Sequence, residues 1–326
     1  MNQQKILIIG ASGFLGSHLV LEFHSHDYQV YACGNKNTDF SYIQDTISNL
    51  IKIDLSLKED RFKLFQFINT NEIKNIIFSV GKVDYKSNKK KSERNNIIPL
   101  VNFITVFKEN MFHVKPRVVF ISSVAHRGFQ NSTNKNNLIS EYTNSLYKSE
   151  FSLYSDIKKE AHTIIEEALK STVDGLIIEP ASLVGASFGK TYTTNSGLIK
   201  KILKGFPVLS GGASYTSVKK VAEGIRLALE KGTHGESYIL GGSNLSMIEF
   251  AKMVNSNRKY IVLLNSITRF LGLFNIVLSN EQSKLGIRYS HVSSEKAIKD
   301  FGYQHSISDL QSAIDETISQ IKKANP

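Results

Sequence analysis

Tyr154 and Lys158 are the two side chains whose spacing most clearly suggests chemistry. Residues four apart lie on the same face of a helix, so that the phenol and the amine reach a common ligand. A tyrosine hydroxyl has a pKa of about 10 and is a poor base at neutral pH, but a nearby cation favours the phenolate. The spacing therefore predicts a general acid/base unit that moves a proton to or from a hydroxyl group. The same spacing also arises by chance on helices that have no catalytic role.

Two adjacent serines, Ser122 and Ser123, lie at the end of an expected strand over residues 117–122. Hydroxyl groups at the carboxyl end of a parallel strand face the crevice where ligands bind. They can hydrogen-bond a carbonyl or an alcohol there. A serine pair that only ends the strand is the alternative.

Three glycines, Gly10, Gly13 and Gly16, follow an apolar run over residues 6–9 and open a segment with a helical apolar period. At such a turn the first glycine allows a sharp reversal and the second a close approach to a pyrophosphate. The third allows tight packing of the helix on the strand. The amino end of the helix then offers N–H groups to phosphates. The pattern predicts a dinucleotide site, with a tight turn that binds nothing as the alternative.

These residues must be positioned by an α/β framework, because apolar runs alternate with helical patterns through the first half of the chain. Strands are expected over residues 6–9, 28–33, 50–54, 75–80, 117–122 and 175–179, with helices over residues 97–109 and 148–169. Parallel strands joined in this way form a Rossmann-type doubly wound sheet that binds ligands at its carboxyl edge.

The second half of the chain has a less regular pattern. Residues 180–217 are rich in Gly, Ser and Thr, with one helix near 196–203, and the segments 215–218 and 236–240 are expected to return to the sheet. Residues 246–323 are mostly helical by period. We therefore expect a dinucleotide-binding domain (1–181 plus 216–242) and a smaller, mostly helical substrate lobe (182–215 plus 243–326).

Residues 261–278 carry apolar side chains at helical spacing, interrupted by polar residues. This pattern favours a core-facing or partner-facing helix over a helix on a membrane surface.

Composition limits the class of protein. The chain of 326 residues carries 40 Lys and Arg against 29 Asp and Glu, a net charge of +11. Its densest basic cluster, residues 86–94, has no aromatic residues interleaved with the cations, which favours a solvated loop over a nucleic-acid patch. The single cysteine, Cys33, fits a reducing compartment. With no expected leader and no long apolar run, we expect a cytoplasmic protein without a transmembrane segment.

Taken together, the motifs resemble the extended, epimerase/dehydratase-like branch of the short-chain dehydrogenase/reductase superfamily over nearly the whole chain. The resemblance is carried by the glycine turn over 10–16, by Asp54-Leu55, and by the strand with its serines over 118–128. It is also carried by Tyr154 with Lys158, by the segment over 179–185, and by the return to the sheet over 218–242. In this family the catalytic hydroxyl lies five residues before a glycine, here Gly128, which selects Ser123 over Ser122.

The resemblance implies that Tyr154 moves the hydroxyl proton, that Lys158 holds the nicotinamide ribose, and that Ser123 orients the substrate oxygen. The residues it implies for cofactor binding are Gly10, Ser12, Gly13, Phe14, Leu15, Gly16, Asn35, Lys36, Asp54, Leu55, Ser79, Val80, Gly81, Tyr154, Lys158, Pro180 and Leu183. Those expected to contact the substrate are Lys82, Ala125, His126 and Asn195. No metal is expected.

The sequence departs from the family pattern at three places. No acidic residue follows the second strand before Asp39, whereas Lys36 can meet a 2′-phosphate, so NADP is favoured over NAD. Glu179 stands where the family usually has arginine. In addition, Ser79 and the Gly81-Lys82 pair replace the family's His-x-Ala-Ala stretch.

The resemblance favours a nucleotide-sugar 4-ketoreductase or 4-epimerase. A reductase similar to dihydroflavonol reductases or hydroxysteroid dehydrogenases is the alternative, and a non-catalytic dinucleotide sensor or structural subunit is the alternative of another class. A homodimer through helices near 97–107 and 157–169 is also expected, as in other family members.

Overall fold

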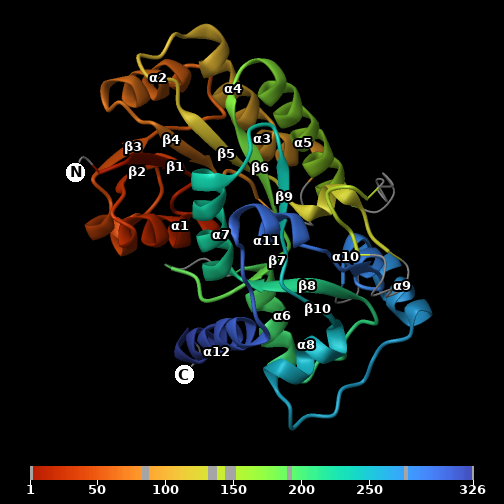
Figure 1. Cartoon of the computed structure of the whole chain (residues 1–326). Helices are drawn as coiled ribbons and strands as arrows, with labels where there is room; N and C mark the ends of the chain where they lie inside the picture. The colour runs from red at the N-terminus through yellow and green to blue at the C-terminus, as the bar shows by residue number, and fades with distance from the viewer. Residues whose placement is uncertain are drawn as a thin grey trace.

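The computed structural model describes residues 3–82, 88–130, 138–143, 152–188, 193–274 and 278–324. Seven parallel strands form its main sheet in the order β3-β2-β1-β4-β5-β6-β9 (Figure 1). Their bounds are β1 (Lys5–Ile9), β2 (Gln29–Gly34), β3 (Asn49–Lys52), β4 (Asn75–Phe78), β5 (Arg117–Ile121), β6 (Asp174–Pro180) and β9 (Ser237–Leu240). The order reverses between β1 and β4, so the ligand crevice of this Rossmann-like fold lies beyond their carboxyl ends.

Helices cover both faces of the main sheet, because successive strand residues point to opposite sides. Ile6 and Ile8 join one core with α1 (Phe14–Ser25), α7 (Val218–Lys231) and α11 (Glu295–Phe301). Leu7 and Ile9 join the other core with α2 (Asp60–Thr70), α4 (Ile98–Glu109) and α5 (Leu153–Ser171). Two 3₁₀ turns, η1 (Ser41–Thr46) and η2 (Val124–Arg127), and the short α3 (Lys89–Asn96) complete this part of the fold.

A second, smaller sheet lies below the first in Figure 1. Its central strand is β8 (Gly212–Ser217), paired antiparallel with β10 (Ser243–Ser246) and parallel with β7 (Ser182–Val184) and β11 (Tyr289–Ser290). The helices α6 (Thr194–Leu203), α8 (Met247–Val254) and α12 (Ile307–Ala324) pack with it around a separate core.

Most predicted elements exist, with ends that differ by one to three residues, but the segment 215–218 does not return to the main sheet. Its first three residues belong to β8 in the small sheet, and Val218 begins α7. The expected strand at 236–240 does return, as β9. The helix predicted from residue 148 begins at Leu153, because the Ser152 side chain accepts the N–H of Ser155 and caps it. Residues 148–151 lie outside the described residues.

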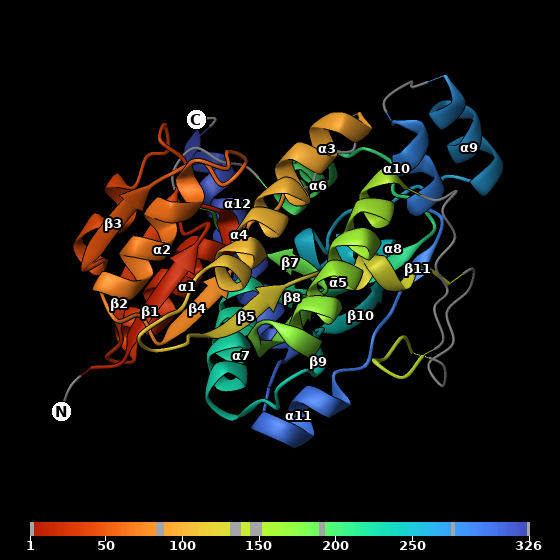
Figure 2. The ribbon, with the colours of Figure 1, turned by 90° about the horizontal axis from the view of Figure 1, so that it is seen from above.

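The segment 261–278 contains α9 (Asn265–Leu273) and leads into α10 (Asn280–Leu285); residues 275–277 lie outside the described residues. The interpretation of a core-facing helix is wrong, because most apolar side chains of α9 are exposed. Figure 2 shows α9 and α10 at the end of the molecule near the start of α5. Among the described helices none has the length and apolar character needed to cross a bilayer.

Candidate active site

The turn after β1 can be built only with glycine at two of its positions. Gly10 has φ +87°, and a Cβ on it would lie 2.6 Å from the carbonyl oxygen of Ser79. A Cβ on Gly16 would lie 2.0 Å from the carbonyl oxygen of Gly10. These close approaches pack the first turn of α1 directly against the end of β1, so that the amino end of α1 opens onto the crevice.

The amino end of α1 is suited to bind phosphate. Gly13 is the exposed N-cap residue, and no side chain caps the helix there. Its Cβ position is 3.2 Å from the Gly10 carbonyl oxygen, so a larger residue would crowd this surface. Ser12 accepts a hydrogen bond from the hydroxyl of Tyr42 through its carbonyl oxygen at 2.7 Å. The backbone N–H groups of Phe14 and Leu15 therefore lie at a helix end that no side chain caps. N–H groups at such an end can bind a pyrophosphate.

The end of β2 is followed by Asn35 and Lys36. The side chain of Lys36 is 55% exposed, and its Nζ lies 3.8 Å from Oδ2 of the buried Asp60. Asp60 also accepts the N–H of Asp54 at 2.8 Å and the Nζ of Lys63 at 2.7 Å. Burial raises the pKa of Asp60, but these hydrogen bonds and cations outweigh it and lower the pKa overall. Asp60 was not singled out from the sequence, because its role depends on the contact between the ends of β2, β3 and α2.

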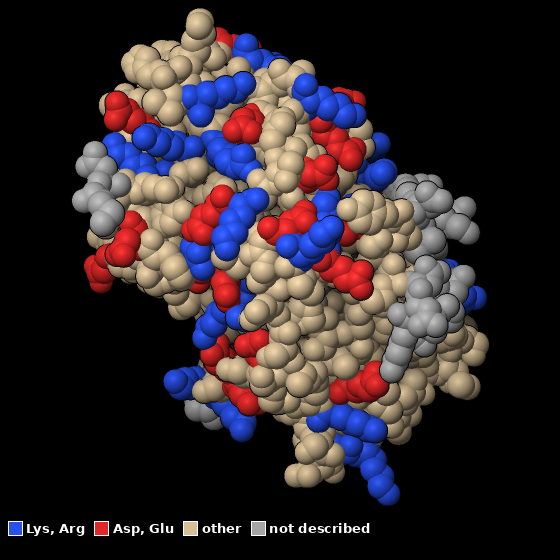
Figure 3. All heavy atoms as spheres, in the orientation of Figure 1, with Lys and Arg blue, Asp and Glu red and all other residues tan. Residues whose placement is uncertain are grey.

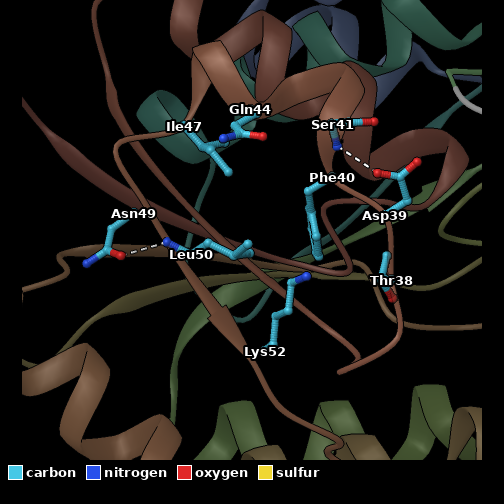
Figure 4. Close-up of a pocket in the computed structure, with 9 residues that line it drawn as sticks. All are labelled: Thr38, Asp39, Phe40, Ser41, Gln44, Ile47, Asn49, Leu50 and Lys52. Carbon is cyan, nitrogen blue, oxygen red and sulfur yellow. Dashed lines mark hydrogen bonds between the residues drawn. The ribbon is translucent and has the colours of Figure 1, made fainter.

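The next acid, Asp39, is engaged locally. Its Oδ1 accepts the N–H of Ser41 at 2.9 Å, as Figure 4 shows. Both residues line a pocket of about 530 Å³ between the loop after β2 and the start of β3. In the same pocket Lys52 Nζ lies 5.7 Å from the centre of the Phe40 ring. Asp39 thus stabilises the turn into η1.

The carboxyl ends of β3 and β4 carry the other predicted cofactor residues. Asp54 Oδ1 accepts the N–H of Ser56, and the buried Leu55 accepts the side-chain amide of Asn102 through its carbonyl oxygen. Ser79 donates its N–H to the carbonyl of Ile9, which joins the end of β4 to the end of β1. Val80 packs partly against the core below. This edge of the sheet therefore faces the glycine turn.

Ser123, Tyr154 and Lys158 lie together beyond β5. The Ser123 side chain lies close enough to the Tyr154 phenol to lower its pKa, and Ser123 Oγ accepts the N–H of Ala125 at 3.3 Å. Lys158 Nζ lies 5.9 Å from the centre of the Tyr154 ring. Ser122, by contrast, points away and hydrogen-bonds His162 at 3.1 Å. The structure therefore separates the two serines and brings Ser123 to the Tyr/Lys pair.

Burial shifts both titrating groups of this cluster toward their neutral forms. It lowers the pKa of Lys158 to about 8. It raises the pKa of the Tyr154 phenol, although the hydrogen bond from Ser123 acts in the opposite direction. Tyr154 is therefore a protonated phenol at neutral pH in the free chain, ready to donate a proton, while Lys158 is largely charged.

Gly81 and Lys82 lie beside the amine of Lys158. A Cβ on Gly81 would lie 2.9 Å from Lys158 Nζ and 3.1 Å from Asn96 Oδ1. Asn96, at the end of α3, also accepts the N–H of Lys82 at 3.0 Å and donates to its carbonyl at 3.3 Å. Lys82 itself is exposed. Asn96 was missed from the sequence, because nothing local marks a buried amide that holds a loop 14 residues away.

Two residues predicted to contact the substrate, Ala125 and His126, are buried. The Nε2 of His126 hydrogen-bonds Oε2 of Glu179 at 2.9 Å, and its ring stacks on His162 at 3.7 Å. Arg127 binds both carboxylate oxygens of Glu179, at 2.6 and 2.7 Å. The Nε2 of His126 is thus engaged in the interior, and its role as a substrate contact stays a prediction.

Glu179 is the centre of this buried cluster. Burial alone would raise its pKa, but the bonds from His126 and Arg127 lower it to about 2. The side chains of His126, His162 and Glu179 offer ligand atoms within 4.8 Å of one another. However, Arg127 engages both oxygens of Glu179, and the Nε2 of His126 is hydrogen-bonded to one of them. The cluster holds η2, and with it Ser123, against β6.

The remaining predicted residues lie between the two sheets. Pro180 ends β6 and is buried, and Leu183 lies in β7. Asn195 donates its side-chain amide to Ser182 Oγ at 3.0 Å and to the Leu183 carbonyl at 2.6 Å. Asn195 therefore ties α6 to β7, and these hydrogen bonds do not point it at a substrate.

A contact from α10 reaches the start of the helix that carries Tyr154. Glu281 Oε1 accepts hydrogen bonds from the hydroxyl of Ser152 and from the backbone N–H of Tyr154. A carboxylate at the amino end of a helix stabilises it through the unpaired N–H groups. Sequence reasoning missed Glu281, because the residue lies more than 120 positions away in the chain.

Comparison with known proteins agrees with this geometry. A solved nucleoside-diphosphate-sugar epimerase from Pseudomonas aeruginosa is 16% identical, covers 99% of both chains and superposes with a TM-score of 0.80. A UDP-glucose 4-epimerase from Thermotoga maritima, solved with UDP-glucose, is also 16% identical, with coverage of 99% of this chain and 100% of that one and a TM-score of 0.75. At this level of identity the likeness shows the fold.

A curated relative, the bifunctional protein gal10 of Schizosaccharomyces pombe, is 29% identical over 180 residues. That match covers 50% of this chain and 24% of the relative, so the chain spans about a quarter of its length. The family model of the NAD dependent epimerase/dehydratase family matches residues 6–241. Those residues include the glycine turn, Ser123, Tyr154 and Lys158, and the chain belongs to the NAD dependent epimerase/dehydratase family.

Proposed function

We propose that this enzyme moves a hydride at a hydroxyl- or keto-bearing carbon of a nucleotide-linked sugar, as a 4-epimerase or a 4-ketoreductase. The observation that carries the proposal is that Ser123, Tyr154 and the buried Lys158 lie together at the carboxyl edge of the sheet. This arrangement provides a proton donor for an alkoxide, or an acceptor for an alcohol proton.

The residues of the crevice fit a bound dinucleotide. The amino end of α1 at Gly13 would hold the pyrophosphate, and Asp54 and Leu55, after β3, would lie beside the adenine. When bound, the nicotinamide supplies the hydride chemistry. Ser123 would orient the substrate oxygen while Tyr154 transfers its proton. Lys158 would hold the nicotinamide ribose and favour the tyrosinate through its charge.

Within this function, we infer a preference for NADP over NAD. Lys36 is exposed, and its Nζ lies 3.8 Å from Oδ2 of Asp60. Its side chain can therefore turn to a 2′-phosphate at the cost of only this long ion pair. Asp39, the first acid after β2, is occupied by the N–H of Ser41. A carboxylate on the ribose 2′-hydroxyl would favour NAD, and Asp39 is not placed to supply one.

The proposed substrate class draws on the relatives named above, which include proteins titled as nucleotide-sugar epimerases. The net charge of +11 suits a phosphorylated substrate as well as the cofactor. On the face drawn in Figure 3, Lys and Arg are interspersed with Asp and Glu, so this face carries no broad basic patch of the kind that binds nucleic acid. We place the substrate in the lobe formed by residues 182–215 and 243–326.

We also propose a homodimer in the cytoplasm. Ile98 and Val101 on the outer side of α4 are 41% and 42% exposed, and they offer an apolar strip beside α5. The contact would be tested by measuring molar mass in solution for the wild type and for Val101→Lys.

The experiment that tests the proposed function begins with the nucleotide. The purified protein is denatured to identify any bound dinucleotide, and the emptied protein is titrated with NADH and NADPH. A Tyr154→Phe variant is expected to bind cofactor normally and to lose turnover of a nucleotide sugar by about a hundredfold or more. Tyr142→Phe, on an exposed tyrosine, is the control. Normal turnover by Tyr154→Phe would contradict the proposed chemistry, and a failure to bind either dinucleotide would contradict the site as a whole.

Lys36→Ala tests the cofactor preference separately. We expect it to weaken NADPH binding by about tenfold and to leave NADH binding unchanged, since one charge-assisted contact is removed. Equal effects on both cofactors would overturn the inferred preference without affecting the proposed reaction.

A further inference from the structure

A row of large apolar side chains stands exposed on one surface of the substrate lobe. It comprises residues of α9 and of the segment before it, between 45% and 71% exposed: Ile261, Leu264, Ile267, Phe270, Leu273 and Phe274. The rings of Phe270 and Phe274 lie 4.9 Å apart. We call these six residues the α9 ridge. Large apolar side chains that stand exposed on one helix and on the segment before it indicate an interaction site.

The outward direction of the ridge is fixed by the opposite side of the helix. Thr268 and Gly272 are buried against α10, and a Cβ on Gly272 would lie 2.0 Å from Ser283 Oγ. Positions 268 and 272 are four apart and share one helix face, so Phe270 and Phe274 must point away from the lobe. The chain therefore holds this apolar surface toward its surroundings.

The charge around the ridge has one sign. No acidic residue occurs between Glu249 and Glu281, whereas Lys252, Arg258, Lys259 and Arg269 lie in that stretch. Lys259 and Arg269 are exposed at the ridge itself, and Arg258 donates to the carbonyls at the end of α6. An apolar helix face flanked by cations matches the interface of a bilayer that carries anionic head groups.

We propose that the α9 ridge docks this enzyme on an anionic membrane surface, with α9 lying in the plane of the head groups. A helix of nine residues is far too short to cross a bilayer, so the attachment is peripheral. A second copy of the chain fits less well, because a two-fold contact through the same surface would place Lys259 and Arg269 against the like charges of the other copy.

Docking in this way would place the active site near the membrane. The ridge helix packs on α10, and Glu281 of α10 hydrogen-bonds Ser152 and the backbone of Tyr154. Only α10 therefore lies between the start of α5, at the edge of the site, and the proposed membrane contact on α9.

The test is binding to vesicles, which does not depend on catalysis. The full chain is sedimented with vesicles of equal parts phosphatidylglycerol and phosphatidylcholine, and with vesicles of phosphatidylcholine alone. We expect the chain to bind the anionic vesicles more than about tenfold more tightly than the neutral ones. Binding to the anionic vesicles should also weaken in 1 M salt, where the Debye length is about 3 Å. Absence of binding to anionic vesicles would overturn the proposal.

Two variants separate the ridge from the rest of the surface. Replacing Ile267, Phe270 and Phe274 together by serine should reduce the partition coefficient by more than about a hundredfold, because three buried side chains no longer enter the apolar layer. Phe62→Ser, at an apolar side chain of α2 that is 59% exposed, should bind as the wild type does. Retained dinucleotide binding shows that the triple variant is folded.

Two outcomes would overturn the assignment of the ridge. One is a triple variant that is folded and binds vesicles as well as the wild type. The other is a wild type that fails to bind vesicles and whose molar mass in solution halves on the triple substitution, because a second copy would then cover the ridge.

Discussion

Lys158→Met is expected to make the cofactor-free chain more stable while removing the amine that we propose acts in catalysis. Lys158 is 8% exposed, and among the described residues no carboxylate forms an ion pair with it. The folded chain therefore holds an ammonium group that has lost much of its hydration. Methionine has a similar length and shape and carries no charge, so it fills the same space without this penalty.

The magnitude follows from the pKa. Burial lowers the pKa of Lys158 from 10.5 to about 8, which corresponds to about 3 kcal/mol of folding free energy. Below pH 8 the amine is charged in both the folded and the unfolded chain, and the full penalty opposes folding. As the pH rises from 8 to 10.5 the folded chain is already neutral while the unfolded chain still binds a proton, so the penalty fades.

Urea denaturation of the cofactor-free wild type and of Lys158→Met, each from pH 7 to pH 10.5, measures this difference. The variant should be more stable by about 3 kcal/mol at pH 7, and the two should converge at the upper end. Lys159→Met, at the neighbouring and less buried lysine, should change stability by less than about 0.5 kcal/mol. A variant less stable than the wild type at pH 7, or a difference that does not vary with pH, would refute the reasoning.

Glu179→Gln should lower the free energy of unfolding by about 3 kcal/mol at pH 7, because Arg127 loses a buried carboxylate partner. In the wild type that contribution is present above pH 4.5 and is lost as the pH falls toward the Glu179 pKa of about 2. A difference in unfolding free energy between wild type and variant that stays the same in acid would contradict this prediction. Gly16→Ala should cost more than about 2 kcal/mol or abolish dinucleotide binding, since its Cβ would lie 2.0 Å from the Gly10 carbonyl oxygen. Gly197→Ala, in the open face of α6, should instead stabilise the chain by about 0.5–1 kcal/mol in the same thermal and urea assays. A Gly197→Ala variant less stable than the wild type would contradict the open space at position 197. A Gly16→Ala variant that binds dinucleotide normally would contradict the close contact with the Gly10 carbonyl oxygen.

The parts of the fold that sequence reasoning could predict are those with local signals. The strands of the main sheet are apolar runs such as Val118–Phe120, which are fully buried and need no alternation. The glycine spacing at 10, 13 and 16 and the four-residue spacing of Tyr154 and Lys158 are also local, so both could be placed before the structure was known.

What could not be predicted depends on contacts between distant segments. β8 reads Gly-Ala-Ser-Tyr-Thr-Ser and has no apolar run, so nothing in it indicates a central strand of a second sheet. His126 follows β5 and looks available for a ligand in the sequence, but Glu179, 53 residues later, holds its side chain. Asn96 and Glu281 contact the site from other elements, and neither carries a local signature.

The two sheets are interleaved along the chain. β7 and β8 belong to the small sheet, β9 closes the main sheet, and the chain then returns to the small sheet for β10 and β11. Neither sheet is complete until the polypeptide has left it and come back, so the lobes cannot finish folding one after the other during synthesis. A polypeptide cut after residue 241, where the family match ends, would lack β10, β11 and two of the three helices that pack on the small sheet, α8 and α12. Such a cut would expose the apolar side of the small sheet rather than release an independent domain, so the whole chain is expected to unfold as one cooperative unit.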